Sequence, residues 1–444
     1  MVGRDHSSEA RTPAGPAVFG LRRLVGPGTA ARYPASVAHS SAEEGSVAFN
    51  SSIESFNGAH CKVAKQEAPA RPGLNRMGPW IIIPSLLLLS LFFPQLPAVA
   101  ASESSLRRLY RERQYFDLRD ALRSNPGDLS SQLLFYKGAI ANKFNHLSLS
   151  ITYLNQYGRW AKKSHNNEFL IDCYDLLADD YLKTYRYRKA ATMYRRILSR
   201  FRNRLTAEQF SDYENSMNKS VALSATPLQS VSFAGDSKLN SAKDRIGLAK
   251  VPIEINGQNI SLPFDTGAAL SVLTYSEAQK LRLRLINFAI KVESFTGAEV
   301  SARLGIASNM KIGNVRLHNV VFLVFEDRDL YLPPISFQIN GLIGFPVITA
   351  LREITFLRDG EILIPGHTHR HGEQNMCFDG STPLLAGTFE GKRLIFSLDT
   401  GANKSDLFPP FYQAYVKEIT SSYVSQSERI RGAGGYKDVH HVSH

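Results

Sequence analysis

The stretch Ile260-Ser261-Leu262-Pro263-Phe264-Asp265-Thr266-Gly267-Ala268 runs from a strand-like apolar pattern straight into an Asp-Thr-Gly-Ala turn. The same design recurs at Arg393-Leu394-Ile395-Phe396-Ser397-Leu398-Asp399-Thr400-Gly401-Ala402, 134 residues later. In both copies a Ser follows six positions after the Asp and a Leu eight positions after it. The first copy is preceded by alternating apolar residues and Asn256-Gly257, a strong hairpin signal. An internal repeat of this size predicts two equivalent β-rich lobes.

Paired carboxylates at equivalent turns favour hydrolytic chemistry. Hydrolysis of a peptide bond needs a nucleophilic water and a proton for the leaving amine, and two carboxylates that share one proton supply both. We therefore predict Asp265 and Asp399 as catalytic residues. Gly267 and Gly401 would let the two backbones approach closely, and the Thr266 and Thr400 hydroxyls would brace the loops. A single Asp-Thr-Gly is an ordinary turn sequence, so the prediction depends on its repetition after apolar strands.

These motifs resemble those of retropepsin-type aspartic peptidases, including exported bacterial ones, over residues 246–365 and again over 382–444. The resemblance implies an endopeptidase with a polypeptide substrate and no cofactor or metal. It also implies, besides the Ala268 and Ala402 positions of the active-site loops, a glycine-tipped flap and an apolar-apolar-Gly strand beneath the first loop. The residues that fit the flap are Phe295, Thr296 and Gly297 in the first copy and Gly432 and Gly434 in the second. The residues that fit the strand are Leu342, Ile343 and Gly344.

The second copy departs from the pattern, because the sequence stops at His444 before its apolar-apolar-Gly strand. Either this sequence is a fragment of a longer two-lobed enzyme, which we favour, or the second lobe has degenerated. In the second case Asp265 of two chains would form the dyad in a homodimer. An alternative function from another class is a catalytically inactive scaffold whose protease-like lobes only bind peptides.

Residues 103–220 carry apolar side chains at three- and four-residue steps, which predicts helices. The set Tyr174, Leu177, Ala178, Tyr181, Ala190, Tyr194 and Ile197 resembles one tetratricopeptide repeat, and Leu134, Gly138, Ala141, Ser150 and Leu154 make a poorer copy. We expect helical hairpins here, serving either as a spacer or as a docking module for a partner protein. The predicted class is thus a helical region followed by mainly-β acid-protease lobes, the second one truncated.

The chain has a net charge of +12, and most of it lies in the helical part. Residues 101–225 carry 21 Lys and Arg against 13 Asp and Glu, whereas residues 226–444 carry 22 against 21. A basic helical face is usually a solvated face, so we expect no nucleic-acid partner.

The apolar run Ile81 to Phe93, with Arg71 and Arg76 before it and Ala98-Val99-Ala100 after it, predicts a secretory signal peptide. The expected location is periplasmic or secreted, with membrane anchoring only if the segment stays uncleaved. We interpret residues 1–76 as a disordered or mis-called extension before a start at Met77. The predicted division of the chain is therefore 1–76, 77–100 as signal, 103–220 as helices, 221–245 as linker, 246–365 as first lobe, 366–381 as connector and 382–444 as partial second lobe.

Cysteine and histidine residues give no further site. The three cysteines, Cys61, Cys173 and Cys377, lack metal-type spacing. Two histidine groups, His367, His369 and His371, and His440, His441 and His444, lie in the connector and at the end of the sequence, where solvated side chains are expected.

Overall fold

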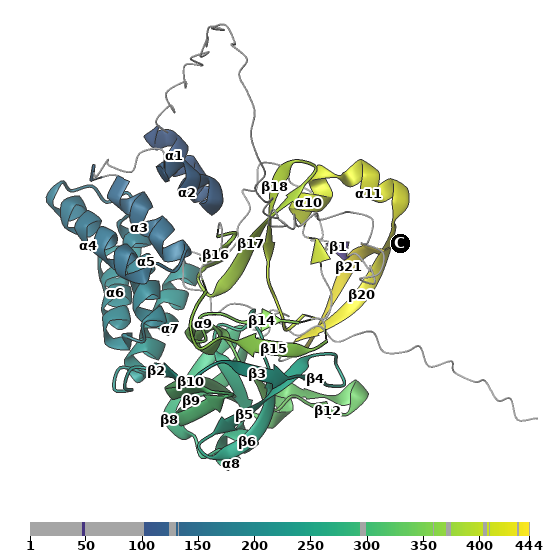
Figure 1. The fold of residues 1–444 in the computed structure, drawn as a ribbon. Coiled ribbons are helices and arrows are strands. Elements are labelled where there is room, and N and C mark those ends of the chain that lie inside the picture. The colour runs from purple at the N-terminus through teal and green to yellow at the C-terminus, as the bar shows by residue number, and fades with distance from the viewer. Residues whose placement is uncertain are drawn as a thin grey trace, which may run out of the picture.

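The computed structural model describes residues 47–48, 102–123, 130–131, 133–293, 299–357, 359–369, 374–402, 406–407, 409–432 and 435–443. The helices between residues 103 and 222 are stacked on one side of the molecule, and two groups of strands lie on the other (Figure 1). The predicted fold class, a helical region followed along the chain by β-rich lobes, is confirmed. The signal-like segment 77–100 lies outside the described residues.

The helical region is a series of antiparallel hairpins. It consists of α1 (Glu103–Arg111), α2 (Tyr115–Arg123), α3 (Leu133–Lys143), α4 (Leu147–Lys163), α5 (Leu170–Lys183), α6 (Tyr187–Arg200), the short 3₁₀ turn Arg202–Arg204 and α7 (Ala207–Ala222). Small residues are placed where helices meet: a Cβ on Gly138 of α3 would lie 2.7 Å from Cγ of Leu154 in α4. Thr206 begins α7 with a capping box, its side chain accepting from the Gln209 amide.

The first lobe is built on a nine-stranded sheet. Its path runs β13-β7-β10-β9-β5-β4, with β2, β6 and β8 attached at its sides. The strands are β2 (Ser230–Phe233), β4 (Ala242–Lys243), β5 (Ala249–Ile255), β6 (Gln258–Pro263), β7 (Ser271–Thr274), β8 (Arg284–Glu293), β9 (Glu299–Ile312), β10 (Val315–Phe325) and β13 (Gly341–Leu342). The predicted hairpin turn is present between β5 and β6, with φ of 49° at Asn256 and 80° at Gly257.

Smaller elements complete this lobe. They are β3 (Ser237–Asn240), α8 (Tyr275–Lys280), the 3₁₀ turns Asp327–Leu330 and Pro333–Ile335, β11 (Tyr331–Leu332), β12 (Phe337–Gln338), α9 (Phe345–Ala350), β14 (Thr355–Phe356) and β15 (Glu361–Ile364). The linker predicted at 221–245 is wrong, because β2 pairs with β10, β3 with β15 and β4 with β5. Its polar composition reflects edge strands with one solvated face rather than a free connection.

The second copy repeats the order of elements of the first. It comprises β16 (Met376–Asp379), β17 (Thr382–Phe389), β18 (Lys392–Ser397), β19 (Asp406–Leu407), α10 (Pro409–Ala414), α11 (Val416–Ser422), β20 (Val424–Gly432) and β21 (Gly435–Ser443), with β1 (Val47–Ala48) paired to β19. The predicted connector 366–381 is wrong at its end, because β16 pairs with β17 and belongs to this copy. Phe389 and Phe396 are about 40% exposed, whereas Ile255 and Leu262, the equivalent positions of the first lobe, are buried.

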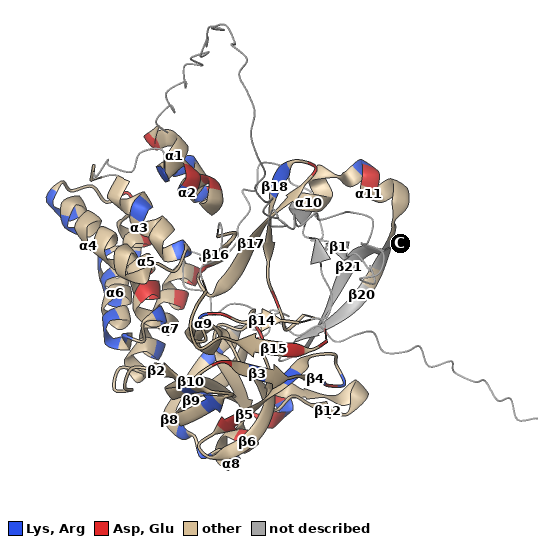
Figure 2. Ribbon diagram, viewed as in Figure 1, with Lys and Arg blue, Asp and Glu red and all other residues tan. Residues whose placement is uncertain are grey.

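The helical region packs against both β-rich parts. Tyr187 and Leu223 belong to the same buried core as Val321 of the first lobe. Tyr115 and Phe116 belong to a second small core with Cys377 of β16. The basic residues of α4 and α6 mark the outer side of the helices, away from the lobes (Figure 2). The helices are thus packed against the rest of the molecule as part of one structure.

None of the helices among the described residues is both long and apolar enough to span a membrane.

Candidate active site

The two Asp-Thr-Gly loops hold each other by reciprocal hydrogen bonds. The Thr266 amide donates to Oγ1 of Thr400 at 3.1 Å, and the Thr400 amide donates to Oγ1 of Thr266 at 3.0 Å. Each threonine hydroxyl then donates across to the opposite strand end, from Thr266 to the Leu398 carbonyl at 2.7 Å and from Thr400 to the Phe264 carbonyl at 2.8 Å. The loops are therefore fixed to one another within one chain, with near two-fold symmetry.

Each glycine of the motif lies against the carboxylate of the other loop. A Cβ on Gly267 would be 2.8 Å from Oδ2 of Asp399, and one on Gly401 would be 2.6 Å from Cγ of Asp265. No side chain fits at either position without separating the loops. The structure thus brings Asp265 and Asp399 together and gives a steric reason for the glycine beside each.

Backbone donors orient both carboxylates. Oδ1 of Asp265 accepts from the amides of Gly267 at 2.9 Å and Ala268 at 3.1 Å. Oδ1 of Asp399 accepts from the Gly401 amide at 2.8 Å. Asp265 is 1% exposed, whereas Asp399 is partly exposed, so the second carboxylate is the more open of the two. Ala268 is also buried, and Ala402 is partly buried after the second loop.

The apolar-apolar-Gly strand lies where the resemblance implies, beneath the first loop. The Asp265 amide donates to the Ile343 carbonyl and the Ile343 amide to the Pro263 carbonyl, both at 2.8 Å. Leu342 pairs with Val272 of β7. A Cβ on Gly344 would be 2.4 Å from the backbone of Leu270, so this position too excludes a side chain. The Gly344 amide donates to Oγ of Ser271 at 3.0 Å, which gives a role to the serine six positions after the Asp.

Burial and mutual repulsion keep a proton on the pair. Burial, and then the nearby Asp399 carboxylate, raise the pKa of Asp265 well above its usual range. Burial also raises the pKa of Asp399, while the Gly401 amide and a hydrogen bond from Asp265 oppose this shift. Two acids this close cannot both ionise readily, so the pair holds one proton over a wide pH range and titrates as a unit.

The predicted flap residues are only partly described. Phe295, Thr296, Gly297 and Gly434 lie outside the described residues. Gly432 ends β20 and pairs with Gly435, the first residue of β21, so it stands at the turn of a hairpin. The strands β8 and β9, which flank the first flap sequence, pair antiparallel, from Arg284 with Ile306 to Glu293 with Glu299.

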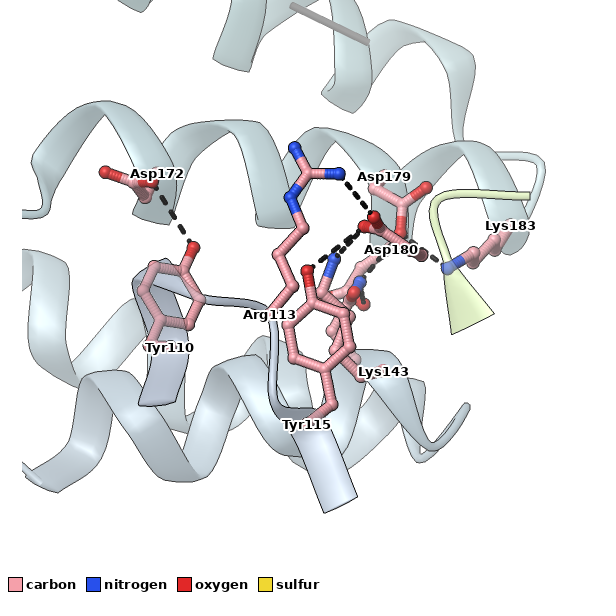
Figure 3. Close-up of polar contacts among 10 residues, drawn as sticks. Tyr110, Arg113, Tyr115, Lys143, Asp172, Asp179, Asp180 and Lys183 are labelled. Carbon is pink, nitrogen blue, oxygen red and sulfur yellow. Dashed lines mark hydrogen bonds and ion pairs between the residues drawn. The ribbon is translucent and has the colours of Figure 1, made fainter. Parts of the chain in front are cut away.

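Sequence reasoning missed a buried carboxylate that joins the second copy to the helical region. Asp379 of β16 accepts from Nη1 of Arg113 at 2.9 Å, from the Tyr115 hydroxyl at 3.3 Å and from Nζ of Lys143 at 2.8 Å. Figure 3 shows Arg113 from the α1–α2 turn, Tyr115 from the start of α2 and Lys143 from α3, with their polar ends close together. β16 leads through β17 and β18 to Asp399, so this cluster helps to place the second loop.

Among the described residues, no group of three or more His, Cys, Asp or Glu side chains is placed to hold a metal ion. His369 contacts Oε1 of Glu353 at 2.9 Å on the surface. Cys173 and Cys377 are buried and are not joined in a disulfide.

Two comparisons with known proteins found similarity to part of this chain. Residues 251–347 match the family model described as aspartyl protease. A solved retropepsin-like aspartic protease from Rickettsia conorii is 20% identical, with a TM-score of 0.21, and the match covers 31% of this chain and 91% of that one. No curated protein matches this chain.

Proposed function

We propose that the chain is an aspartic endopeptidase in which Asp265 and Asp399 of one molecule activate the hydrolytic water. The observation that carries the proposal is the reciprocal threonine contact, which holds the two Asp-Thr-Gly loops and their carboxylates together. The aspartyl protease match over residues 251–347 supports it from the sequence side. The contact within one chain favours a single-chain dyad over the two-chain alternative.

The surroundings of the two acids suggest how the roles divide. The hydrogen bond between them raises the pKa of Asp265, after the effects of burial and of Asp399 charge, and lowers that of Asp399. The pair shares one proton, and these opposite effects favour the arrangement in which Asp265 donates and Asp399 accepts. Asp399 would take a proton from the water as its oxygen bonds to the peptide carbon, while Asp265 would donate its proton to the carbonyl oxygen. When the C–N bond breaks, the proton held by Asp399 would pass to the leaving amine, and a hydroxyl of the tetrahedral intermediate would return a proton to Asp265 as the carboxylic acid forms.

Export of the enzyme is part of the proposal and is supported only by the signal-like pattern at 77–100. Expression in a bacterium with periplasmic fractionation tests it. Recovery of the unprocessed chain in the cytoplasmic fraction alone would contradict export.

Cleavage of a denatured protein by the purified chain, followed across about pH 3 to 8, tests the catalytic proposal. We expect activity that is abolished by Asp265→Asn and by Asp399→Asn, and inhibited by a statine-type transition-state mimic. Because Ala268 and Ala402 cannot donate a side-chain hydrogen bond to the carboxylates, we expect the optimum at weakly rather than strongly acidic pH. A folded chain that cleaves nothing in this range would favour the peptide-binding scaffold instead.

A further inference from the structure

The outer side of α4 and α6 carries a dense set of cationic side chains. Residues 181–207 contain nine Lys and Arg and no Asp or Glu, and residues 129–167 also lack Asp and Glu. Six of these cations are exposed near the ends of α4 and α6 and in the 3₁₀ turn that follows α6. These six, which we call the basic face, are Arg159, Lys162, Lys163, Arg196, Arg200 and Arg204.

Contacts with α5 and its preceding turn bring the cations of the two helices onto one surface. The charged ends of Lys162 in α4 and Arg196 in α6 both lie over the ring of Tyr174 in α5, each 5.8 Å from the ring centroid. Nη1 of Arg204 donates to the Asn167 carbonyl, in the α4–α5 turn, at 3.1 Å. The ends of α4 and α6 are therefore neighbours, and their cations form one positive region on the outer side of the helices (Figure 2).

The acidic residues of the helical region do not neutralise the basic face. Within the part of the chain that the structure describes, none of its six cations forms an ion pair. Glu168, which lies in the α4–α5 turn, is already bound by Nη1 of Arg107 at 2.9 Å. Asp180 of α5 is buried and accepts from the Ser150 hydroxyl at 2.7 Å. The basic face thus carries an uncompensated positive charge.

Helix stability does not account for this arrangement. Arg159 and Lys163 are four residues apart, as are Arg196 and Arg200, and like charges at this spacing destabilise a helix. The helix dipole favours cations in the last turn, where Lys163 and Arg200 lie, but it disfavours Arg188 in the first turn of α6, which contains no acidic residue. The charges therefore oppose folding in part, which favours a role in binding a polyanion.

We propose that the basic face binds the surface of an anionic phospholipid bilayer, with lipid phosphates as its counter-ions. The cations are spread over two helices that both pack on α5, so they form a broad surface rather than a projecting element. A groove of duplex DNA admits a helix or ribbon that projects into it, whereas a bilayer presents a broad layer of charge. The export predicted from residues 77–100 would also bring the chain to a membrane and away from nucleic acids. Because the basic face is turned away from the lobes, the bound chain would keep its dyad open to substrate (Figure 2).

Co-sedimentation of the full chain with vesicles tests the proposal without any measurement of peptidase activity. One set of vesicles is phosphatidylcholine alone, which controls for insertion of the apolar run 81–93, and the other is equal parts phosphatidylcholine and phosphatidylglycerol. At about 0.15 M salt we expect at least about tenfold tighter binding to the anionic vesicles. This preference should disappear at about 1 M salt, where charges are screened within about 3 Å.

A triple variant locates the binding surface. Its substitutions are Arg159→Gln, Lys163→Gln and Arg200→Gln, all at exposed positions of the basic face. A cation near an anionic bilayer contributes about fivefold in affinity, so the loss of three should weaken binding to the anionic vesicles by about a hundredfold.

The matched control removes the same charge from exposed positions of the first lobe. It consists of Arg284→Gln, Lys311→Gln and Arg316→Gln, and it should leave binding nearly unchanged. The proposal is overturned if both kinds of vesicle bind equally at about 0.15 M salt, or if the two triple variants weaken binding alike. It is also overturned if immobilised duplex DNA retains the chain and the anionic vesicles do not. The comparisons of lipid and salt on the parent chain decide the matter if the first variant does not fold.

Discussion

The buried carboxylate of Asp379 gives the sharpest quantitative prediction. Asp379→Asn keeps the size of the side chain but removes its charge. Lys143, which is 5% exposed and lies 2.8 Å away, would then be left as a buried ammonium without its counter-ion. Arg113 is a third exposed and can turn to water, so most of the cost falls on Lys143.

The size of the effect follows from the burial of this pair. Removal of one member of a buried ion pair typically costs about 3 to 5 kcal/mol. The free energy of unfolding of a native protein is only about 5 to 15 kcal/mol, so this loss is a large share of the total stability. Burial alone would lower the pKa of Lys143, and it is Asp379 that raises it above its usual range. That stabilisation is fully present at neutral pH, below the ordinary lysine pKa, and it is lost as the pH rises through the raised value.

Urea-induced unfolding followed by far-ultraviolet circular dichroism measures the loss. The matched control is Asp117→Asn, which also breaks a contact between the helical region and the second copy. Asp117 pairs with Arg393 at 2.6 Å, but both side chains are 40% or more exposed, so its loss should cost at most about 1 kcal/mol. The double variant Lys143→Met with Asp379→Asn should be less destabilised than Asp379→Asn alone, because no buried charge is left over. The reasoning is refuted if Asp379→Asn costs no more than Asp117→Asn.

Three further predictions, the first with its own control substitution, concern the dyad and the helical region. Gly267→Ala places a methyl group 2.8 Å from Asp399 and should abolish cleavage. The control is Gly158→Ala in α4, whose Cβ would be 3.8 Å from its nearest neighbour; it should leave cleavage intact and stabilise the fold by up to about 1 kcal/mol. Equal activities of the two variants would contradict the steric argument. Asp265→Asn should raise the melting temperature at neutral pH. The reason is that a carboxyl whose pKa is raised in the folded state contributes stability at low pH and loses it as the pH rises through that pKa. If thermal melts show the same difference between variant and parent at acid and at neutral pH, the argument is contradicted. Burial raises the pKa of Asp180 to about 7. Asp180→Asn should therefore change the stability of the fold little at a pH below the ordinary Asp pKa, and should stabilise the fold by up to about 4 kcal/mol at pH above 7. Melting curves at several pH values would reveal or exclude this trend.

The local chemistry of the sequence predicted the parts of the fold that depend on neighbouring residues. The Asn256-Gly257 turn is one example, because its two positive φ angles need these residue types wherever they occur. The Asp-Thr-Gly loops are another, since each carries its own oriented carboxylate and its own glycine. Their repetition indicated that the loops would meet, and the reciprocal threonine contacts follow from that symmetry.

Contacts between distant segments were beyond the reach of this reasoning. Lys143 and Asp379 are 236 residues apart, and neither lies in a motif. The strands within 221–245 were missed because polar edge strands such as Ser237–Asn240 resemble connections until their partners are known. β16 was missed for the same reason, since it is only four residues long and its pairing with β17 supplies the order. The helices were predicted, but their packing against both lobes was not.

The shared core of the helices and the first lobe has a consequence for how such a protein can evolve. Tyr187 and Leu223 pack with Val321, so neither part can exchange its surface residues freely while the other stays unchanged. A first lobe transferred to a new gene without these helices would carry an unmatched apolar face into its new host. Inheritance should therefore keep the two segments together, and substitutions at Tyr187 should be accompanied by compensating changes across the junction.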